Sequence, residues 1–224
     1  MTSWFNLPLV HITALLILIP VAYLIGSIPF GLLVGFTKGV DVRTAGSRNI
    51  GATNVSRLLG KKFFFVVFFL DMSKSLIPML IASGIVHQIA EHNRTLYLMW
   101  LGVGFAAVLG HMFSVFLKFR GGKGVATSAG MMLGLFPYYT VPGAIAIGMF
   151  IVVFLIWRYI SLGSVVAACA FPVIYLLIGL WRGWPVFGDQ LPLLIFAVVI
   201  AVLITIKHKS NIKRLWDGTE NKFR

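Results

Sequence analysis

Long stretches without a charged residue dominate this sequence. Residues 9–36 and 95–117 contain no Asp, Glu, Lys or Arg, and each exceeds the roughly 20 residues that a helix needs to cross a bilayer. Only 11% of the 224 residues are charged and 59% are hydrophobic, too little charge to cover a soluble domain. Lipid offers no partner for exposed backbone N–H and C=O groups, so we expect helices. Hydrophobic and polar residues do not alternate with a period of two, which argues against a transmembrane β-barrel. The sequence therefore predicts an all-α, polytopic transmembrane helix bundle.

About seven crossings are expected along the chain. They are residues 9–36, 63–86, 95–117, 125–136, 139–157, 162–180 and 191–206. The fourth has 12 residues and would reach only about 18 Å as a helix. Six crossings and a re-entrant hairpin therefore remain as alternatives. No internal repeat or linker is evident, so we expect one integral membrane domain over residues 1–224.

The positive charge of the chain is concentrated on one side of these crossings. Of the 19 lysines and arginines, 16 fall in segments 38–62 and 118–123, at Arg158 and in the tail from residue 207. The opposite side holds Arg94 and Arg182. The positive-inside rule then predicts an outside N-terminus and a cytosolic C-terminus. Membrane orientation accounts for the net charge of +13, so no nucleic-acid partner is expected.

The longest polar segment, residues 46–57, reads GSRNIGATNVSR. Its glycines let successive backbone N–H groups converge on an anion, and Ser, Thr and Asn add neutral donors. Arg48 and Arg57 can form bidentate hydrogen bonds to phosphate. An ordinary basic loop would share this composition, and the pattern is neither a Walker A motif nor a dinucleotide-binding fingerprint. The segment alone indicates an anion-binding loop without proving one.

A second polar segment, residues 110–124, reads GHMFSVFLKFRGGKG. Its GGKG tract suits close approach of the backbone to an anion, with Lys123 as a point charge. His111 lies near the end of a crossing, where an ionisable side chain is costly and often functional. A structural hydrogen bond to a neighbour would explain this histidine equally well.

A third segment, residues 208–220, reads HKSNIKRLWDGTE. If the last helix continues, His208, Asn211 and Arg214 share one face. A basic tail that binds anionic lipid headgroups would look similar. In the second crossing, Asp71 and Lys74 are three residues apart, which predicts an ion pair on one helix face.

The conjunction of three basic, polar segments at membrane boundaries indicates a polyanionic ligand that arrives from the cytosol and a partner dissolved in the bilayer. No pair of carboxylates suits a paired-acid mechanism, no His-x4-Asp motif occurs, and no cluster has metal-ligand spacing. The single cysteine, Cys169, supports neither a disulfide nor a metal site. No metal or cofactor is expected. A transporter for a small organic anion and a noncatalytic lipid-binding anchor are the alternatives.

Three motifs carry a resemblance to a known family. They are GSxNIGATNV at 46–55, GHxF with GGKGVAT at 110–127, and HxxNIxRL with GTE at 208–220. At these residues the sequence resembles the acyl-phosphate-dependent glycerol-3-phosphate acyltransferases of bacteria, the PlsY family. The resemblance implies a multi-pass inner-membrane enzyme with a cytosolic active site. It would transfer a fatty acyl group from acyl phosphate to glycerol 3-phosphate, giving lysophosphatidate and inorganic phosphate. Functional coupling to the enzyme that makes acyl phosphate is a further expectation.

The resemblance and the chemistry of the side chains together give candidate site residues. The candidates for the chemical step are Ser47, His111, His208 and Asn211. The candidates for substrate and phosphate binding are Gly46, Asn49, Gly51, Thr53, Asn54, Arg57, Gly121, Gly122, Lys123, Gly124, Ser161, Arg214 and Glu220. Either His208 or His111 could be the general base, since histidine titrates in the useful range. A substrate phosphate could take the proton instead.

Three positions depart from the pattern common in this family. Residue 48 is Arg where a small residue is common, residue 114 is Ser where Pro is common, and residue 75 is Ser in place of a frequent Gly. None of the three is a candidate for the chemistry.

Overall fold

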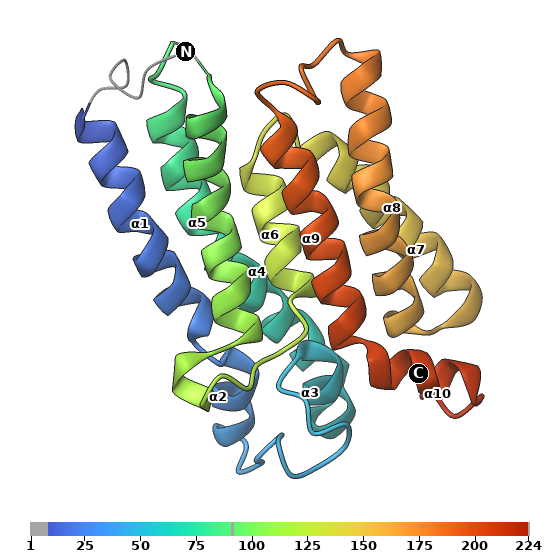
Figure 1. Cartoon of the computed structure of the whole chain (residues 1–224). Coiled ribbons are helices and arrows are strands. Elements are labelled where there is room, and N and C mark those ends of the chain that lie inside the picture. Colours follow the sequence, from blue (N-terminus) through green and yellow to red (C-terminus); the bar gives the residue numbers. More distant parts are fainter. Residues whose placement is uncertain (1–8, 91, 224) are drawn as a thin grey trace. The chain divides into compact units, whose positions relative to one another are not determined.

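The computed structural model describes residues 9–90 and 92–223, and every regular element in these ranges is a helix (Figure 1). The chain divides into two compact units, which are described separately. The first comprises the residues up to Ala90 together with Gly102–Gly134, and the second comprises Glu91–Leu101 and Leu135–Arg224. Helix α5 (Arg94–Met112) contributes to both. The all-helical fold class is confirmed, whereas a single domain stays a prediction.

Within the described ranges, five helical stretches are long and apolar enough to cross a membrane. They are Leu9–Phe36, Lys62–Val86, Arg94–Leu117, Thr140–Trp157 and Ile160–Trp181. Helix α9 (Leu191–Lys207) becomes a sixth when it is counted with α10 (Lys209–Trp216), from which it is bent by 60°. The expected crossing at 125–136 corresponds to α6 (Val125–Gly134), whose ten residues reach only about 15 Å. The prediction of seven crossings stays a prediction.

The first expected crossing is a broken helix. Helix α1 (Leu9–Ser27) ends just before Pro29, and α2 (Phe30–Phe36) starts just after it. Proline has no backbone N–H to continue the hydrogen-bond ladder, and it restrains the residue before it from helical geometry. Two side chains bond the carbonyl groups at the break: Ser114 Oγ donates to Ser27 O at 2.6 Å and Lys74 Nζ donates to Ile28 O at 2.8 Å.

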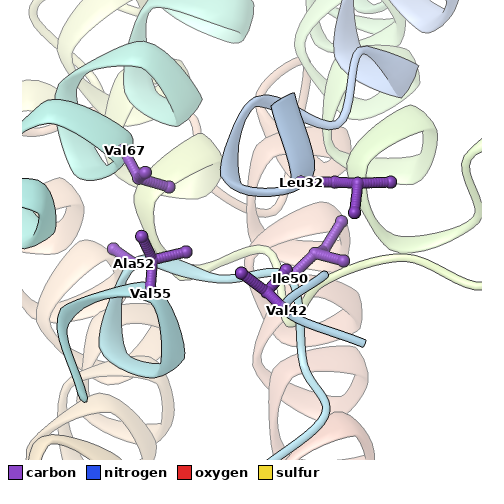
Figure 2. Packing of buried hydrophobic residues seen from close by; sticks show 6 residues of the cluster. All are labelled: Leu32, Val42, Ile50, Ala52, Val55 and Val67. Atoms are coloured by element: carbon purple, nitrogen blue, oxygen red, sulfur yellow. The ribbon is translucent and has the colours of Figure 1, made fainter. Parts of the chain in front are cut away.

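A small apolar core anchors the polar loop that follows α2. Figure 2 shows its members, which come from α2, the loop, α3 (Ala52–Leu59) and α4 (Lys61–Val86). They are Leu32, Val42, Ile50, Ala52, Val55 and Val67. Because Val42 and Ile50 are buried at the two ends of segment 43–49, that segment is tied down on both sides.

In the first unit, the backbone of α1 also lies very close to the last turns of α5. A Cβ atom on Gly110 would collide with the carbonyl oxygen of Tyr23 and crowd the backbone of Gly26 and Ser27. Small residues let helices in a membrane approach backbone to backbone, where dispersion forces and not water exclusion drive association. Gly110 therefore sets the spacing of α1 and α5 next to His111.

In the second unit, α7 (Thr140–Trp157) and α8 (Ile160–Trp181) run side by side, and α9 packs against α8 (Figure 1). A short turn at Arg158 joins α7 to α8, with Arg158 in the left-handed region at φ 63°. The end of the chain returns to this turn, because Phe223 N donates to Arg158 O at 2.8 Å. These contacts place the tail beside the start of α8.

Gly110→Ala should lower the midpoint of thermal unfolding in detergent, because the added methyl group meets backbone that cannot move without parting α1 from α5. We expect a loss of about 1–3 kcal/mol, typical of overpacking. The control is Gly148→Ala in α7, where a Cβ meets nothing within 4 Å. Equal midpoints for the two variants would contradict the close approach.

Candidate active site

Asn54 organises the first polar loop. Its side chain is 2% exposed, and its Nδ2 donates to the carbonyl oxygens of Val42 (2.9 Å), Asn49 (2.9 Å) and Ala45 (3.2 Å). Its Oδ1 accepts the backbone N–H of Ser47 at 2.8 Å. A buried amide satisfied in this way fixes the loop backbone on both sides of Gly46. The structure thus places Asn54 beneath the loop, bonded to its backbone.

The other candidate residues of segment 46–57 differ in burial and in hydrogen bonding. Asn49 Oδ1 accepts the N–H of Gly51 at 2.9 Å, a local turn that leads into α3 at Gly51. Thr53 is half-buried in the first turn of α3, whereas Ser47 and Arg57 are exposed. The loop therefore exposes the hydroxyl of Ser47 and α3 exposes the guanidinium of Arg57, while Asn49 and Asn54 hold the loop backbone in place.

Arg48 lies at the tip of this loop in a strained backbone conformation. Its φ is 56°, in the left-handed region that costs a residue with a Cβ roughly 1–2 kcal/mol. A small residue is common at this position in the resembled family, and glycine would adopt the same φ freely. Nearby, hydrogen bonds from Arg43 to Asp41 hold the pKa of that carboxyl at about 2.

His111 and the glycine tract are packed together at the end of α5. The backbone N–H of Gly122 donates to His111 O at 3.0 Å. A Cβ on Gly122 would overlap the imidazole ring, with Nε2 as its nearest atom. Any side chain at this position would displace the histidine. The GGKG tract thus folds back over His111, and Lys123 is half-buried within it.

A buried ion pair lies against the same histidine. Asp71 and Lys74 are 3% and 2% exposed, and Asp71 Oδ1 is 2.9 Å from Lys74 Nζ. The ion pair that the i, i+3 spacing predicts is therefore confirmed. Lys74 Nζ also lies 3.0 Å from His111 Nδ1. The sequence did not predict this second contact, because 37 residues separate the two side chains.

Two departures from the family pattern have structural roles here. Ser114, where Pro is common, donates through its hydroxyl to Ser27 at the break after α1. Ser75, which replaces a frequent Gly, donates through its hydroxyl to Thr127 O and so joins α4 to α6. Both serines donate to backbone carbonyls of other segments, and Ser75 is the neighbour of Lys74 in the sequence.

Glu220 accepts hydrogen bonds from three other candidate residues of the second unit. Its Oε1 accepts from Ser161 Oγ at 2.9 Å and from Asn211 Nδ2 at 2.7 Å, while its Oε2 accepts from Arg214 Nε at 2.7 Å. Burial acts to raise the pKa of Glu220, but these hydrogen bonds outweigh burial and lower it. The carboxylate therefore ties α10 and the tail to the start of α8.

His208 stands at the bend between α9 and α10 and is 2% exposed. Its Nδ1 lies 2.8 Å from the carbonyl oxygen of Ile204. A carbonyl oxygen can only accept, so Nδ1 carries the hydrogen and Nε2 carries the lone pair in the neutral ring. Asn211 follows one turn later, with its amide held by Glu220.

The candidate residues fall into three groups, two in the first unit and one in the second. The first unit brings together His111 with Gly121, Gly122, Lys123 and Gly124, and separately the loop at 46–57. The second unit brings together Ser161, Asn211, Arg214 and Glu220, with His208 one turn away. The part of the chain that the structure describes holds no group of three or more His, Cys, Asp or Glu side chains arranged to bind a metal ion.

Membrane-length helices with basic, glycine-rich and asparagine-rich segments at their ends define an integral membrane protein suited to anionic substrates. The glycerol-3-phosphate acyltransferase family model matches residues 16–218. The chain belongs to the glycerol-3-phosphate acyltransferase family, and the resemblance inferred from its motifs is confirmed. It is a multi-pass membrane acyltransferase.

Individual relatives extend the match over almost the whole chain. The glycerol-3-phosphate acyltransferase of Trichlorobacter lovleyi is 48% identical over 213 residues, covering 95% of this chain and 99% of that protein. The crystal structure of PlsY (YgiH), an integral membrane glycerol 3-phosphate acyltransferase, in its glycerol 3-phosphate form is 41% identical and has a TM-score of 0.78. Its lysophosphatidic acid form is 40% identical with a TM-score of 0.75. Each comparison covers 94% of this chain and 96% of the other.

Arg48→Gly should raise the free energy of unfolding by about 1 kcal/mol, because glycine relieves the left-handed strain at the loop tip. Arg48→Ala is the matched control, since it removes the same charge but keeps a Cβ at φ 56°. Thermal unfolding in detergent measures both. A gain in both variants would assign the effect to charge and contradict the strain.

Glu220→Gln should destabilise the protein by about 1–3 kcal/mol at neutral pH, because a carboxylate that accepts three hydrogen bonds is lost. The lowered pKa of Glu220 determines how its contribution to stability depends on pH. Stabilisation by Glu220 is complete above the usual glutamate pKa of about 4.3 and is lost as the pH falls through the lower folded value. The variant and the parent should therefore converge in acid. Asp217→Asn, an exposed neighbour, is the control; an equal effect there would refute the role of Glu220.

Proposed function

We propose that this chain transfers a fatty acyl group from acyl phosphate to glycerol 3-phosphate. A hydroxyl oxygen of glycerol 3-phosphate attacks the acyl carbon, the bond from that carbon to the phosphate oxygen breaks, and the hydroxyl proton passes to a base. The products are lysophosphatidate and inorganic phosphate. Acyl phosphate is a mixed anhydride and already activated, so the reaction needs no covalent enzyme intermediate and no cofactor.

In the first unit, the main support for this proposal is that the GGKG tract folds back over His111. A glycine backbone with Lys123 beside it is suited to a phosphate group, because N–H groups and a cation both stabilise its negative charge. Segment 46–57 adds the exposed Ser47 on the loop, whose backbone Asn54 holds, and the exposed Arg57 on α3. We assign Arg57 and Lys123 to phosphate neutralisation, and Ser47 and Asn49 to substrate orientation.

In the second unit, His208 is the better candidate for the general base. The hydrogen bond of its Nδ1 to Ile204 O leaves the lone pair on Nε2, which is the form that accepts a proton. Glu220 holds Asn211 and Arg214 in fixed orientations, and such preorganisation lets them align substrate and stabilise charge without rearranging. A substrate phosphate remains the alternative proton acceptor.

The proposed reaction joins a water-soluble substrate to a lipid-soluble one. The acyl chain would lie among apolar helices, where each buried CH₂ contributes about 0.8 kcal/mol. The concentration of 16 of 19 basic residues on one side supports an active site on the cytosolic face of the bacterial inner membrane. Functional coupling to the enzyme that supplies acyl phosphate belongs to the same proposal.

The test uses purified protein in lipid vesicles with palmitoyl phosphate and labelled glycerol 3-phosphate. We expect lysophosphatidate and inorganic phosphate in equal amounts, both dependent on glycerol 3-phosphate. Palmitoyl-CoA in place of palmitoyl phosphate should give no product. Product from palmitoyl-CoA alone would overturn acyl phosphate as the donor. Uptake of glycerol 3-phosphate into vesicles without any product would favour a transporter and overturn the proposal.

A further inference from the structure

The ammonium of Lys74 has three acceptors around it. They are Asp71 Oδ1 at 2.9 Å, Ile28 O at 2.8 Å and His111 Nδ1 at 3.0 Å. An ammonium carries three N–H donors and no lone pair. Each donor therefore has one partner, and the buried cation is fully satisfied. Since Lys74 can only donate, His111 Nδ1 must accept.

This contact determines the protonation of His111. If Nδ1 carried a hydrogen, two hydrogen-bond donors would face each other at 3.0 Å with no acceptor between them, which is unfavourable. Asp71 Oδ1 is 3.6 Å from the same nitrogen, too far for a good hydrogen bond. One carboxylate, one ammonium and a neutral imidazole also leave the buried cluster without net charge, which a low-dielectric environment favours. The hydrogen of the imidazole thus resides on Nε2.

The Nε2 edge of the ring faces the glycine tract. Nε2 is the atom nearest to the position that a Cβ of Gly122 would occupy, and the backbone N–H of Gly122 donates to His111 O. A change in ring orientation would therefore move Gly122 and the adjoining Lys123. His111 is bonded to Lys74 on one edge and packed against the tract on the other.

We propose that Asp71 and Lys74 hold His111 as its Nε2–H tautomer, and that His111 is a positioning residue for the glycine tract and not the general base of the reaction. Its ring is bonded to Lys74 through Nδ1 and packed against Gly122 along the Nε2 edge, and this fixed ring orients the segment that carries Lys123. The tautomer follows from the hydrogen-bond geometry alone, whereas the positioning role rests on the proposed function. This assignment is opposite to that of His208, whose hydrogen lies on Nδ1.

Nitrogen NMR of ¹⁵N-histidine-labelled protein tests the tautomer without any substrate, with His111→Gln as the subtraction sample that identifies the signal. We expect an unprotonated Nδ1 and a protonated Nε2 for His111, unchanged between about pH 6 and about pH 9. A protonated Nδ1 in this range would overturn the assignment. The result is independent of acyl transfer, so it stands even if the proposed function fails.

Kinetics of two variants test the positioning role. In His111→Gln the side-chain amide oxygen can replace Nδ1 as the acceptor for Lys74, so we expect KM for glycerol 3-phosphate to rise less than about tenfold. In His111→Ala the ammonium of Lys74 loses this acceptor, so we expect a rise of about tenfold to a hundredfold, as for loss of a hydrogen bond to a charged group. The pH dependence of kcat should be unchanged in both.

His87→Gln, an exposed histidine outside the candidate site, is the control and should match the parent. A loss of kcat in both His111 variants, together with loss of the acidic limb of the pH profile, would make His111 the base and overturn the proposal. Equal KM values for His111→Gln, His111→Ala and the parent would overturn the positioning role. Absence of lysophosphatidate in the parent would instead be a failure of the proposed function.

Discussion

The arrangement of the first unit depends on one buried cation, the ammonium of Lys74. A charge in a membrane-spanning helix is costly unless every donor has a partner, and removal of one partner leaves that cost uncompensated. Here the partners come from three segments: Asp71 on α4, Ile28 at the break after α1, and His111 at the end of α5. The cation therefore fixes the relative positions of three segments far apart in the sequence.

Both polar segments of the first unit, residues 46–57 and the glycine tract, are connected to this cluster through the chain or through direct contact. The break at Pro29 turns the chain into α2 and then into the loop at 46–57, which an apolar core and Asn54 hold from beneath (Figure 2). The glycine tract folds over His111, which leaves the backbone of Gly122 against the ring. In the second unit a buried carboxylate has the same role, because Glu220 orients Asn211, Arg214 and Ser161. In each unit a buried charge thus holds polar segments in a fixed conformation, as preorganised acyl transfer requires.

Local features of the sequence predicted much of this structure. Residues 9–36 and 95–117 had to be helical, because lipid leaves no other partner for the backbone. Asp71 and Lys74 lie three apart, so their ion pair followed from helix geometry. His111 could not be assigned to Lys74, nor Ser161 to Glu220, since 37 and 59 residues separate these partners and only the tertiary fold joins them. Residues 9–36 form one membrane-length stretch as predicted, and Pro29 marks the short break between α1 and α2 within it. The three hydrogen bonds that Glu220 accepts depend on this tertiary fold as well, and its role in substrate binding stays a prediction.

The buried ion pair should then position the segments that we propose bind the phosphate groups. Equilibrium binding of labelled glycerol 3-phosphate to the double variant Asp71→Asn/Lys74→Met tests it most directly, because replacement of both charges avoids leaving one buried and unpaired. We expect the variant to fold, because no charge is left buried and unpaired, but with a lower thermal midpoint, because Ile28 O and His111 Nδ1 lose their donor. Its Kd for glycerol 3-phosphate should rise by about tenfold or more, as for the loss of at least one hydrogen bond in a charged site. A folded variant with an unchanged Kd would contradict the account.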